Sequence, residues 1–432
     1  MKKCFLIMVG MFQLLSIQAQ ERKIIKAGPE QIEALFLAQN LQLIAERLNV
    51  DIADAAVIQA RLWNNPVLSL SQVNLWSTDS QREGVDDVIP PLFGSFGKNT
   101  EFSVELSQLI RTVGKRRKLV HREKLAKEIA LQDFEDVLRG LKVELRKNIH
   151  EMIYLQSYLN VLNRQEEVLE RLIVSHKAQM SSGNISKNEV LRLQASLLEL
   201  QSETNETQTE INEMQKMLKI LLHAEANVYI EIEDMTGVWL DPENISIVQL
   251  LDSTIHRPDV MSYQLQVQYH NRSLAYEKAH RIPDVEIAAS YDRYGGVWKN
   301  FVGFGVNVEL PFFNRNQGNI KTAGIQLEQS RYLAEQQQNM AFQEVMASYN
   351  DYVMSYNFYR KIHENEFLVE YETMMDAYVH NLSSKNIGMV EFMDFFDVYK
   401  ANKQTLLTAR KKMNICFEEL QYYTGKELRI EN

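Results

Sequence analysis

The sequence predicts a mixed, mainly α-helical fold in which four β-strands accompany long antiparallel coiled-coil helices, organised as an internal twofold repeat. Three observations predict this fold class: two long stretches without proline, heptad patterns of apolar residues inside them, and one strand-to-helix motif that occurs twice. Each half of the chain is expected to contain strand, loop, strand, corner, long helix, small polar turn and returning helix. The two halves are residues 20–225 and 226–432.

The positions of the prolines allow two very long helical regions. None of the eight prolines lies between Pro91 and Pro242, and none follows Pro311. Because proline breaks the interior of a helix, long helices are expected inside these two gaps. The expected long helices are residues about 115–180 and 185–223 in the first half, and about 318–382 and 387–424 in the second. Shorter helical patterns, at about 29–61 and 246–282, precede the first strand of each half.

The clearest coiled-coil pattern lies in the returning helix of the first half. Apolar residues, together with two threonines, recur there in alternating steps of three and four. They are Val190, Leu193, Leu197, Leu200, Thr204, Thr207, Ile211, Met214, Leu218 and Leu221. Such a seam favours helices that pack along their length. Periodicity alone fits a soluble dimeric coiled coil or a periplasmic adaptor hairpin equally well.

Four stretches alternate between apolar and polar residues as β-strands do. These predicted strands are residues about 66–76, 100–110, 284–292 and 301–311. In the last of them the even-numbered residues from Val302 to Leu310 are apolar, whereas most odd-numbered residues are small or polar. Alternation over about ten residues suits a tilted transmembrane strand. Four strands cannot close a barrel alone, so they need other subunits or a partner that covers their edges. A small soluble sheet is the alternative.

The N-terminal residues 1–19 have the pattern of a secretion signal. Lys2 and Lys3 precede an apolar run, and Ala19 occupies a cleavage-like position. Removal of this segment leaves only Cys416, so no intrachain disulfide is expected. Cys4 precedes the apolar run and therefore cannot be a lipid-accepting cysteine placed after it. The net charge of −10 argues against nucleic acid as a partner.

The sequence contains no motif of a familiar enzyme or cofactor site. It has no phosphate-binding loop, no GxSxG, no HExxH and no paired CxxC. The nine histidines are scattered without the spacing of metal ligands, and lone ones such as His176 and His380 are interpreted as packed or solvated residues. We therefore expect no catalytic residue, no cofactor and no metal ligand.

One strand-to-helix motif occurs twice, as VELSQLIRTVG from Val104 and as VELPFFNRNQG from Val308. Two small polar turns also match each other, SSGNISKNE at residues 181–189 and SSKNIGMVE at residues 383–391. With RPD from Arg257, RIPDV from Arg281 and LPFFNRNQG from Leu310, the chain resembles the TolC-like outer-membrane efflux protein family. Within that family it resembles the cobalt–zinc–cadmium efflux outer-membrane components. The resemblance covers essentially the whole mature chain.

The resemblance implies a homotrimer in the outer membrane with a periplasmic extension. Each protomer would give its four strands to a shared barrel and its helices to a periplasmic tunnel, with Arg111 and Arg315 at the periplasmic interface of the membrane. The implied partners are outer-membrane lipid, a periplasmic adaptor (membrane fusion) protein and an inner-membrane pump of the resistance-nodulation-division type. The chain would be a passive duct that exports substrates such as heavy-metal cations. The alternative within the family is the duct of a drug-efflux or type I protein secretion system.

The duplicated corner would be the place where the chain leaves the membrane sheet and enters the tunnel wall. Pro311 or Ser107 is expected to end strand pairing, because proline cannot donate a hydrogen bond to a strand ladder. Gly114 and Gly318 are expected to allow the tight turn into the following helix.

The two small polar turns would be periplasmic tips that contact the adaptor. They comprise Ser181, Ser182, Gly183, Asn184 and Ile185 in the first turn, and Ser383, Ser384, Lys385, Asn386 and Ile387 in the second.

Three acidic residues follow the second turn. Glu391, Asp394 and Asp397 are spaced by three and therefore share one helical face, which by pattern alone is an ordinary solvated face. In the family an acidic pair at this place lines the narrow periplasmic entrance, and Glu391 and Asp394 match that pair. Three copies around an axis would form acidic rings, which favour cations. The family's basic residue just upstream is absent, because Ile387 occupies its place.

Overall fold

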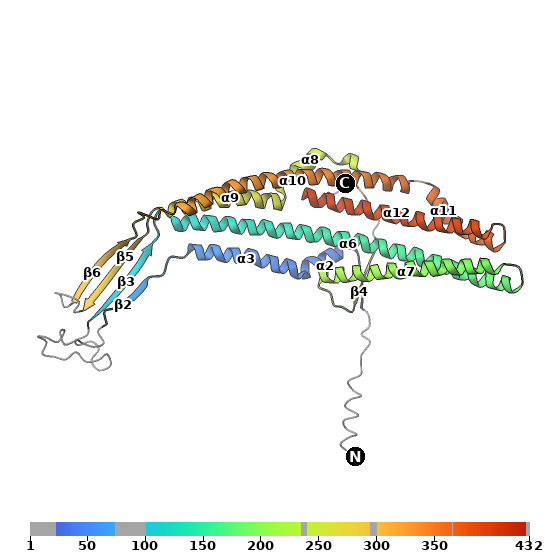
Figure 1. Cartoon of the computed structure of the whole chain (residues 1–432), viewed down its shortest axis with the longest axis horizontal. Helices are drawn as coiled ribbons and strands as arrows, with labels where there is room; N and C mark the ends of the chain where they lie inside the picture. The colour runs from blue at the N-terminus through green and yellow to red at the C-terminus, as the bar shows by residue number, and fades with distance from the viewer. Residues whose placement is uncertain (1–22, 74–100, 235–239, 294–299, 365, 429–432) are drawn as a thin grey trace, which may run out of the picture. The chain divides into compact units, whose positions relative to one another are not determined.

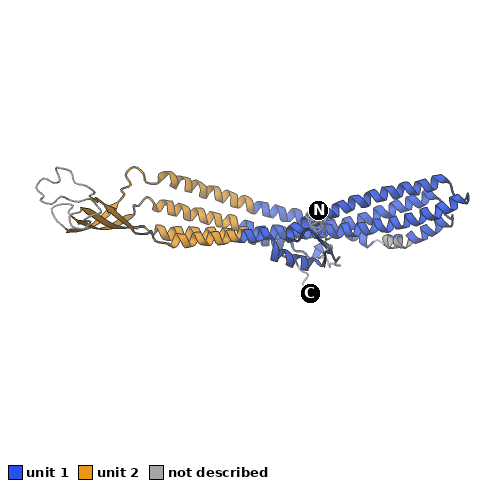
Figure 2. Cartoon of the chain, turned by 90° about the horizontal axis from the view of Figure 1, so that it is seen from below, with its two compact units in different colours: residues 1–47, 134–260, 338–432 blue, residues 48–133, 261–337 orange. Residues whose placement is uncertain are grey.

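The computed structural model describes residues 23–73, 101–234, 240–293, 300–364 and 366–428, whose helices and strands are drawn in Figure 1. The chain divides into two compact units (Figure 2). Unit 1 contains residues 1–47, 134–260 and 338–432, and unit 2 contains residues 48–133 and 261–337. Each unit draws on both sequence halves, so the units do not coincide with residues 20–225 and 226–432. The predicted signal at residues 1–19 lies outside the described residues.

A four-stranded antiparallel sheet forms the end of unit 2. Its strands are β2 (Val67–Ser71), β3 (Phe102–Ile110), β5 (Val285–Arg293) and β6 (Asn300–Val308). Their order across the sheet is β2-β3-β5-β6, so β2 and β6 are the outer strands. All four predicted strands are present, but β2 and β6 end earlier than expected. Residues 74–76, which were expected to continue the first strand, lie outside the described residues.

The register places most apolar residues of the four strands on one face. Leu70 lies opposite Val104, Val104 opposite Tyr291, and Tyr291 opposite Val302. Because neighbouring residues of a strand point to opposite faces, the alternation seen in the sequence becomes one continuous apolar surface. Phe304 on this surface is 88% exposed. The opposite face is mostly small or polar. It carries Ser69, Ser71, Ser103, Glu105, Ser107, Glu286, Ser290, Asp292, Gly303, Gly305 and Asn307, with Val67, Leu109, Ala288 and Phe301 as its apolar members.

The first corner joins β3 to the long helix α6 (Lys115–Ser181). Val113 and Gly114 both have left-handed backbone conformations there, with φ of 52° and 67°, so Gly114 makes the turn as predicted. The side chain of Lys115 is 3% exposed, and its Nζ lies 2.8 Å from Oδ1 of Asp284. The N–H of Thr112 donates to the same oxygen at 2.8 Å. These contacts fix the start of α6 to the start of β5.

The expectation that Ser107 ends strand pairing is wrong. Ser107 pairs with Val67 on β2 and with Ala288 on β5, and β3 continues to Ile110. Its hydroxyl donates to Oε1 of Glu286 at 2.7 Å, so the serine satisfies its polar group within the sheet.

The second corner joins β6 to helix α10 (Gln317–His363) and turns at a different residue from the predicted one. Asn316 is the left-handed residue, with φ of 58°, whereas Gly318 already lies inside α10. The expected role of Gly318 in the turn is therefore wrong, because asparagine tolerates the left-handed region and provides the turn itself. The Nδ2 atom of Asn316 donates to Oε2 of Glu277 at 2.7 Å. Pro311 lies beyond the end of β6 at Val308, consistent with its expected place after the ladder.

The long helices of unit 1 form two antiparallel pairs. The first pair is α6 with α7 (Lys187–Leu222), and the second is α11 (Glu366–Ser383) with α12 (Met389–Thr424). The single helix expected at 318–382 is instead two helices, α10 and α11. Absence of proline permits a continuous helix but does not require one. The last turn of α10 carries Arg360, Lys361 and His363, which suit the negative end of a helix dipole.

The remaining elements are shorter. They are β1 (Lys23–Ala27), α2 (Pro29–Gln39), α3 (Leu41–Arg61), β4 (Val228–Ile232), the 3-10 turns η2 (Pro242–Asn244) and η3 (Thr254–His256), α8 (Ile247–Ser253) and α9 (Pro258–Ala279). The parallel pairing of β1 with β4 was not expected from the sequence. Gln215 of α7 is buried, and its Oε1 accepts the N–H of Ile230 at 3.0 Å. Its amide also donates to the carbonyl of Ile230, so this side chain satisfies the outer edge of β4.

Candidate functional site at the two helical turns

The turn between α6 and α7 is closed by its own backbone. Gly183 is left-handed, with φ of 74°, and its N–H donates to the carbonyl of Met180 at 3.0 Å. The N–H of Asn184 donates to the carbonyl of Gln179 at 2.9 Å. This pair of hydrogen bonds is the Schellman motif, which satisfies carbonyls that the end of a helix leaves free. Ser186 then caps α7 by accepting the N–H of Glu189 at 3.3 Å.

The turn between α11 and α12 has the same geometry. Lys385 is its left-handed residue, with φ of 61°, and its N–H donates to the carbonyl of Leu382 at 3.1 Å. The N–H of Asn386 donates to the carbonyl of Asn381 at 2.8 Å. The matching sequences therefore form matching backbone turns, with lysine where the first turn has glycine.

The two turns lie together at one end of unit 1 (Figure 1). The Nζ atom of Lys385 donates to the carbonyl of Asn184 at 3.0 Å, which links them directly. Between them is an open groove of about 710 Å³. Side chains from both pairs line it, among them His176, Ile185, Arg192, Leu382, Ile387 and Val390.

The predicted tip residues are accessible to a partner. Eight of the ten are exposed, and only Ile185 and Ile387 are half-buried. Sequence reasoning did not identify His176 as part of this region. The His176 side chain is 1% exposed, and its Nδ1 donates to the carbonyl of Leu172 at 3.0 Å. A histidine at a seam position of α6 is therefore packed, as the sequence suggested, but it also borders the groove.

The acidic residues after the second turn share an exposed face of α12. Glu391, Asp394 and Asp397 are exposed, whereas Phe392 and Phe396 on the other side of the helix are buried. Partial burial raises the pKa of Asp397, and the charges of Glu199 and Asp394 add to this effect while Lys400 opposes it. Glu391 lies in the first turn of α12, where the helix dipole by itself favours a negative charge.

A single apolar core lies beneath both turns. It contains residues from α6, α7, α11 and α12, so the two helical pairs are packed against each other. The core residues include Leu162, Leu169, Leu193, Leu200, Met375, Leu382, Phe392, Phe395, Phe396 and Tyr399. The rings of Tyr378 on α11 and Phe395 on α12 stack with their centroids 3.8 Å apart. The position of the acidic face therefore depends on the packing of α12 into this core.

Ion pairs join α12 to the α6–α7 pair. The Nζ of Lys400 lies 2.8 Å from Oε2 of Glu203 on α7, and the hydroxyl of Tyr158 on α6 donates to the same carboxylate. Although burial alone opposes it, the bonds from Lys400 and Tyr158 hold the pKa of Glu203 below its usual value. Farther along α12, the Nζ of Lys411 lies 2.8 Å from Oε1 of Glu151. These partners are distant in sequence, so no local pattern predicted them.

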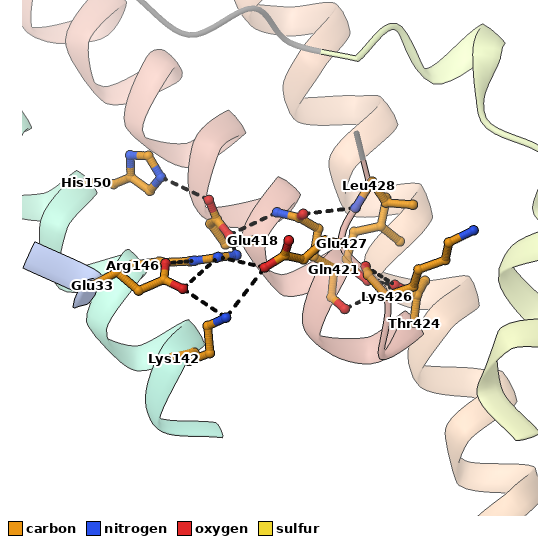
Figure 3. Close-up of polar contacts among 11 residues, drawn as sticks. Glu33, Lys142, Arg146, His150, Glu418, Gln421, Thr424, Lys426, Glu427 and Leu428 are labelled. Carbon is orange, nitrogen blue, oxygen red and sulfur yellow. Dashed lines mark hydrogen bonds and ion pairs between the residues drawn. The ribbon is translucent and has the colours of Figure 1, made fainter. Parts of the chain in front are cut away.

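A second polar cluster holds the far end of α12, near its C-terminus (Figure 3). Arg146 on α6 contacts Glu33 of α2 at 2.9 Å, Glu418 of α12 at 3.1 Å, and Glu427 beyond α12 at 3.2 Å. Lys142, one turn earlier on α6, pairs with Glu33 at 2.8 Å. Burial by itself raises the pKa of Glu33, but Arg146 and Lys142 outweigh this and lower it.

The same cluster continues from Glu418. The Nε2 of His150 lies 3.5 Å from Oε1 of Glu418, and the amide of Gln421 donates to its Oε2 at 3.0 Å. The Oε1 of Gln421 accepts the N–H of Leu428 at 3.0 Å, as Figure 3 shows. The cluster thus joins α2, α6, the end of α12 and the segment that follows it. None of its contacts involves a residue of the two turns.

Within the described ranges, no group of three or more His, Cys, Asp or Glu side chains is arranged to hold a metal ion. Within the same ranges, no helix has both the length and the apolar character needed to cross a membrane.

Comparisons with solved structures identify the same architecture. A crystal structure of CusC has a TM-score of 0.73 with this chain, with 17% sequence identity and coverage of 96% of each chain. The outer membrane channel CmeC of Campylobacter jejuni has a TM-score of 0.74 and 15% identity, over 92% of this chain and 85% of CmeC. At such identities, these similarities concern the fold.

Sequence comparisons extend the similarity. The chain is 23% identical over 333 residues to the cobalt-zinc-cadmium resistance protein CzcC of Cupriavidus metallidurans, which covers 71% of this chain and 70% of CzcC. The model of the outer membrane efflux protein family matches residues 34–222 and 251–357, which is more than half of the chain. The resemblance noted from the motifs is thereby confirmed, and the chain belongs to the outer membrane efflux protein family.

Proposed function

We propose that this chain is one protomer of a homotrimeric outer-membrane channel, which conducts substrates passively out of the periplasm as part of a tripartite efflux system. The observation that carries the proposal is the sheet of unit 2. Its face with Leu70, Val104 and Val302 is apolar and exposed, and each of its outer strands β2 and β6 has one edge without a partner strand among the residues that the structure describes. A transmembrane barrel needs an apolar outer face and no free edge.

Three copies of the sheet would satisfy both requirements at once. Pairing β6 of one copy with β2 of the next continues the antiparallel order and closes the sheet on itself. The apolar face then meets lipid, and the face with Glu105, Glu286 and Asn307 lines the lumen. A soluble coiled-coil adaptor, the alternative from another class, gives no reason for an exposed apolar sheet, and membership of the outer membrane efflux protein family argues against it.

The long helices are proposed to form the periplasmic tunnel, with the two turns as its tips. The exposed tip residues, including Asn184 and Asn386, would contact a periplasmic adaptor. The sequence holds no motif for nucleotide hydrolysis, so the energy for transport would come from an inner-membrane pump joined through that adaptor. We assign the pump to the resistance-nodulation-division type on the family resemblance. The duplication of the turns and corners is proposed to reflect an internal repeat.

Heavy-metal cations are the proposed substrates. Two features support them: the similarity to a protein named for cobalt, zinc and cadmium resistance, and the exposed acidic face of Glu391, Asp394 and Asp397 near the tips. Acidic rings at a trimer axis attract cations and repel anions. The second candidate is a duct for drug efflux or type I protein secretion. Under the first proposal, a strain that lacks the chain should lose resistance to these metals. Under the second, it should lose resistance to drugs if the duct exports drugs, and no resistance if the duct secretes protein.

The channel itself is tested with the purified protein. Outer membranes solubilised in detergent should yield a trimer that dissociates on heating, and this trimer should conduct ions in a planar lipid bilayer. A protein that is extracted without detergent and conducts nothing would contradict the proposal.

The gate is tested with the double variant Glu391→Ala and Asp394→Ala. Removal of two charges per protomer should weaken block by divalent cations and reduce cation preference, because the acidic rings are gone. Asp351→Ala, which removes an exposed charge from α10, is the matched control and should change neither property. Unchanged block and selectivity in the double variant would show that these acids form only a solvated face.

A further inference from the structure

The buried seam of α6 contains an amide among apolar side chains. Leu155, Leu162, Leu169 and Leu172 recur along this face, and each is 2% exposed or less. Gln165 occupies the same face between Leu162 and Leu169 and is also 2% exposed. Those two leucines belong to the core that α6 shares with α7, α11 and α12.

Both polar atoms of this side chain lack a partner. Neither Oε1 nor Nε2 of Gln165 has a hydrogen bond to any part of the chain that the structure describes. Its polar neighbours are satisfied: Glu166 accepts the hydroxyl of Thr204, and Glu203 is bonded to Lys400. On α6, one polar atom each of Gln156 and Asn148 also lacks a partner, but among the residues that the structure describes only Gln165 has two such buried atoms.

Gln215 provides the contrast within the same chain. It is 4% exposed, and its amide bonds both the N–H and the carbonyl of Ile230. A buried amide with two good hydrogen bonds stabilises the fold. A buried amide without a hydrogen bond costs free energy, because it has lost its bonds to water and gained none in return.

We propose that Gln165 weakens the closed packing of the helices around the two turns. A partner then needs only a small preference for the open over the closed state to open them. Separation of α12 from α6 would admit water to the amide and remove its penalty, which favours the open arrangement. The inference rests on the proposed function as a gated channel. It concerns the packing of α12 against α6 and α7, which holds the acidic face in place. A ligand shifts such an equilibrium only by its difference in affinity for the two states, so a weakened closed state lowers the affinity required.

The test replaces the amide with an apolar side chain of similar size. Gln165→Leu should raise the temperature of thermal unfolding in detergent and lower the open fraction of single channels in planar bilayers roughly five- to a hundredfold, because an unsatisfied buried amide is lost. Gln165→Met should act in the same direction. Methionine is unbranched like glutamine, so this variant shows whether any effect of leucine comes from its branched shape. Gln215→Leu is the matched control and should lower the unfolding temperature, since it removes two hydrogen bonds that are made.

Three results would overturn the inference. A lower unfolding temperature for both Gln165 variants would mean that the amide is satisfied in the native packing. A higher unfolding temperature with an unchanged open fraction would separate the buried amide from gating. Loss of a defined trimer in both variants would mean that the amide specifies the register of the helices, as polar seam residues do in coiled coils. A wild-type trimer without any conductance would instead contradict the proposed function.

Discussion

Arginine at Val306 should prevent the sheet from assembling in a bilayer, whereas arginine at the adjacent Asn307 should be tolerated. The two positions are neighbours on β6 and therefore differ in face rather than in depth. Val306 lies opposite Ile287 on the apolar face and is 70% exposed. Asn307 lies opposite Glu286 on the polar face, and its Nδ2 donates to that carboxylate at 3.3 Å.

The expected difference follows from these surroundings. An arginine on the lipid face costs about 2–4 kcal/mol at the middle of the membrane and less near the interfaces. Since 1.4 kcal/mol is a tenfold change in an equilibrium, the equilibrium constant for folding of Val306→Arg in the membrane should fall roughly 30- to 700-fold. An arginine at Asn307 faces water and has Glu286 as a ready partner, so its effect on assembly should be small.

The assay is the yield of heat-sensitive trimer in the outer membrane, compared between the two variants at matched expression. Val306→Arg should give little trimer, and Asn307→Arg should give a yield near that of the unmodified chain. Equal yields of the two variants would refute the assignment of the apolar face to lipid, and with it the barrel. A loss in Asn307→Arg alone would invert the assignment of the two faces.

Three further outcomes are expected. Lys115→Met should lower the free energy of unfolding by about 3 kcal/mol, because it leaves the partly buried carboxylate of Asp284 without its ion pair, and an unchanged denaturation curve would contradict this. Partial burial, Glu199 and Asp394 raise the pKa of Asp397 in this packing; if separation of the helices relieves them, closure should strengthen as pH falls through that raised pKa, above the ordinary 3.8, and weaken as pH rises. Asp397→Asn should remove this pH dependence from single-channel recordings, and a retained dependence would assign it elsewhere. Photo-crosslinkers at Asn184 and Asn386 should capture a periplasmic adaptor in cells, whereas capture only from the loop between β5 and β6 would reverse the orientation of the chain.

Much of the fold could be predicted because its periodic patterns are long. The bounds of α6 and α7 differ from the expected ones by one or two residues, since an unbroken heptad seam and the lack of proline leave few alternatives. The strands were predicted for the same reason, as alternation places most apolar residues on one face. The break between α10 and α11 was missed because no proline or glycine marks it.

Features that depend on distant partners could not be predicted. Strands β1 and β4 are five residues each, and they are stabilised by each other and by Gln215 rather than by a local pattern. The turn at Asn316 was assigned to Gly318 because the sequence offers both residues, and only the backbone shows which one is left-handed. The acids after the second turn were predicted to share a face, and they do. Their role at an entrance remains a prediction, because it depends on other copies of the chain.

The pairing of β2 with β6 between copies tests the central claim most directly. Ser69→Cys on β2 should be combined in turn with Gly303→Cys, Gly305→Cys and Asn307→Cys on β6, all on the polar face. Cys416 is 1% exposed and should not interfere. Oxidation in outer membranes should produce covalent dimers and trimers for the combination that matches the register. Leu68→Cys with the same β6 cysteines should not crosslink, since it lies on the opposite face. Monomers alone from every Ser69→Cys combination, in a protein that reaches the outer membrane, would contradict a barrel shared between copies.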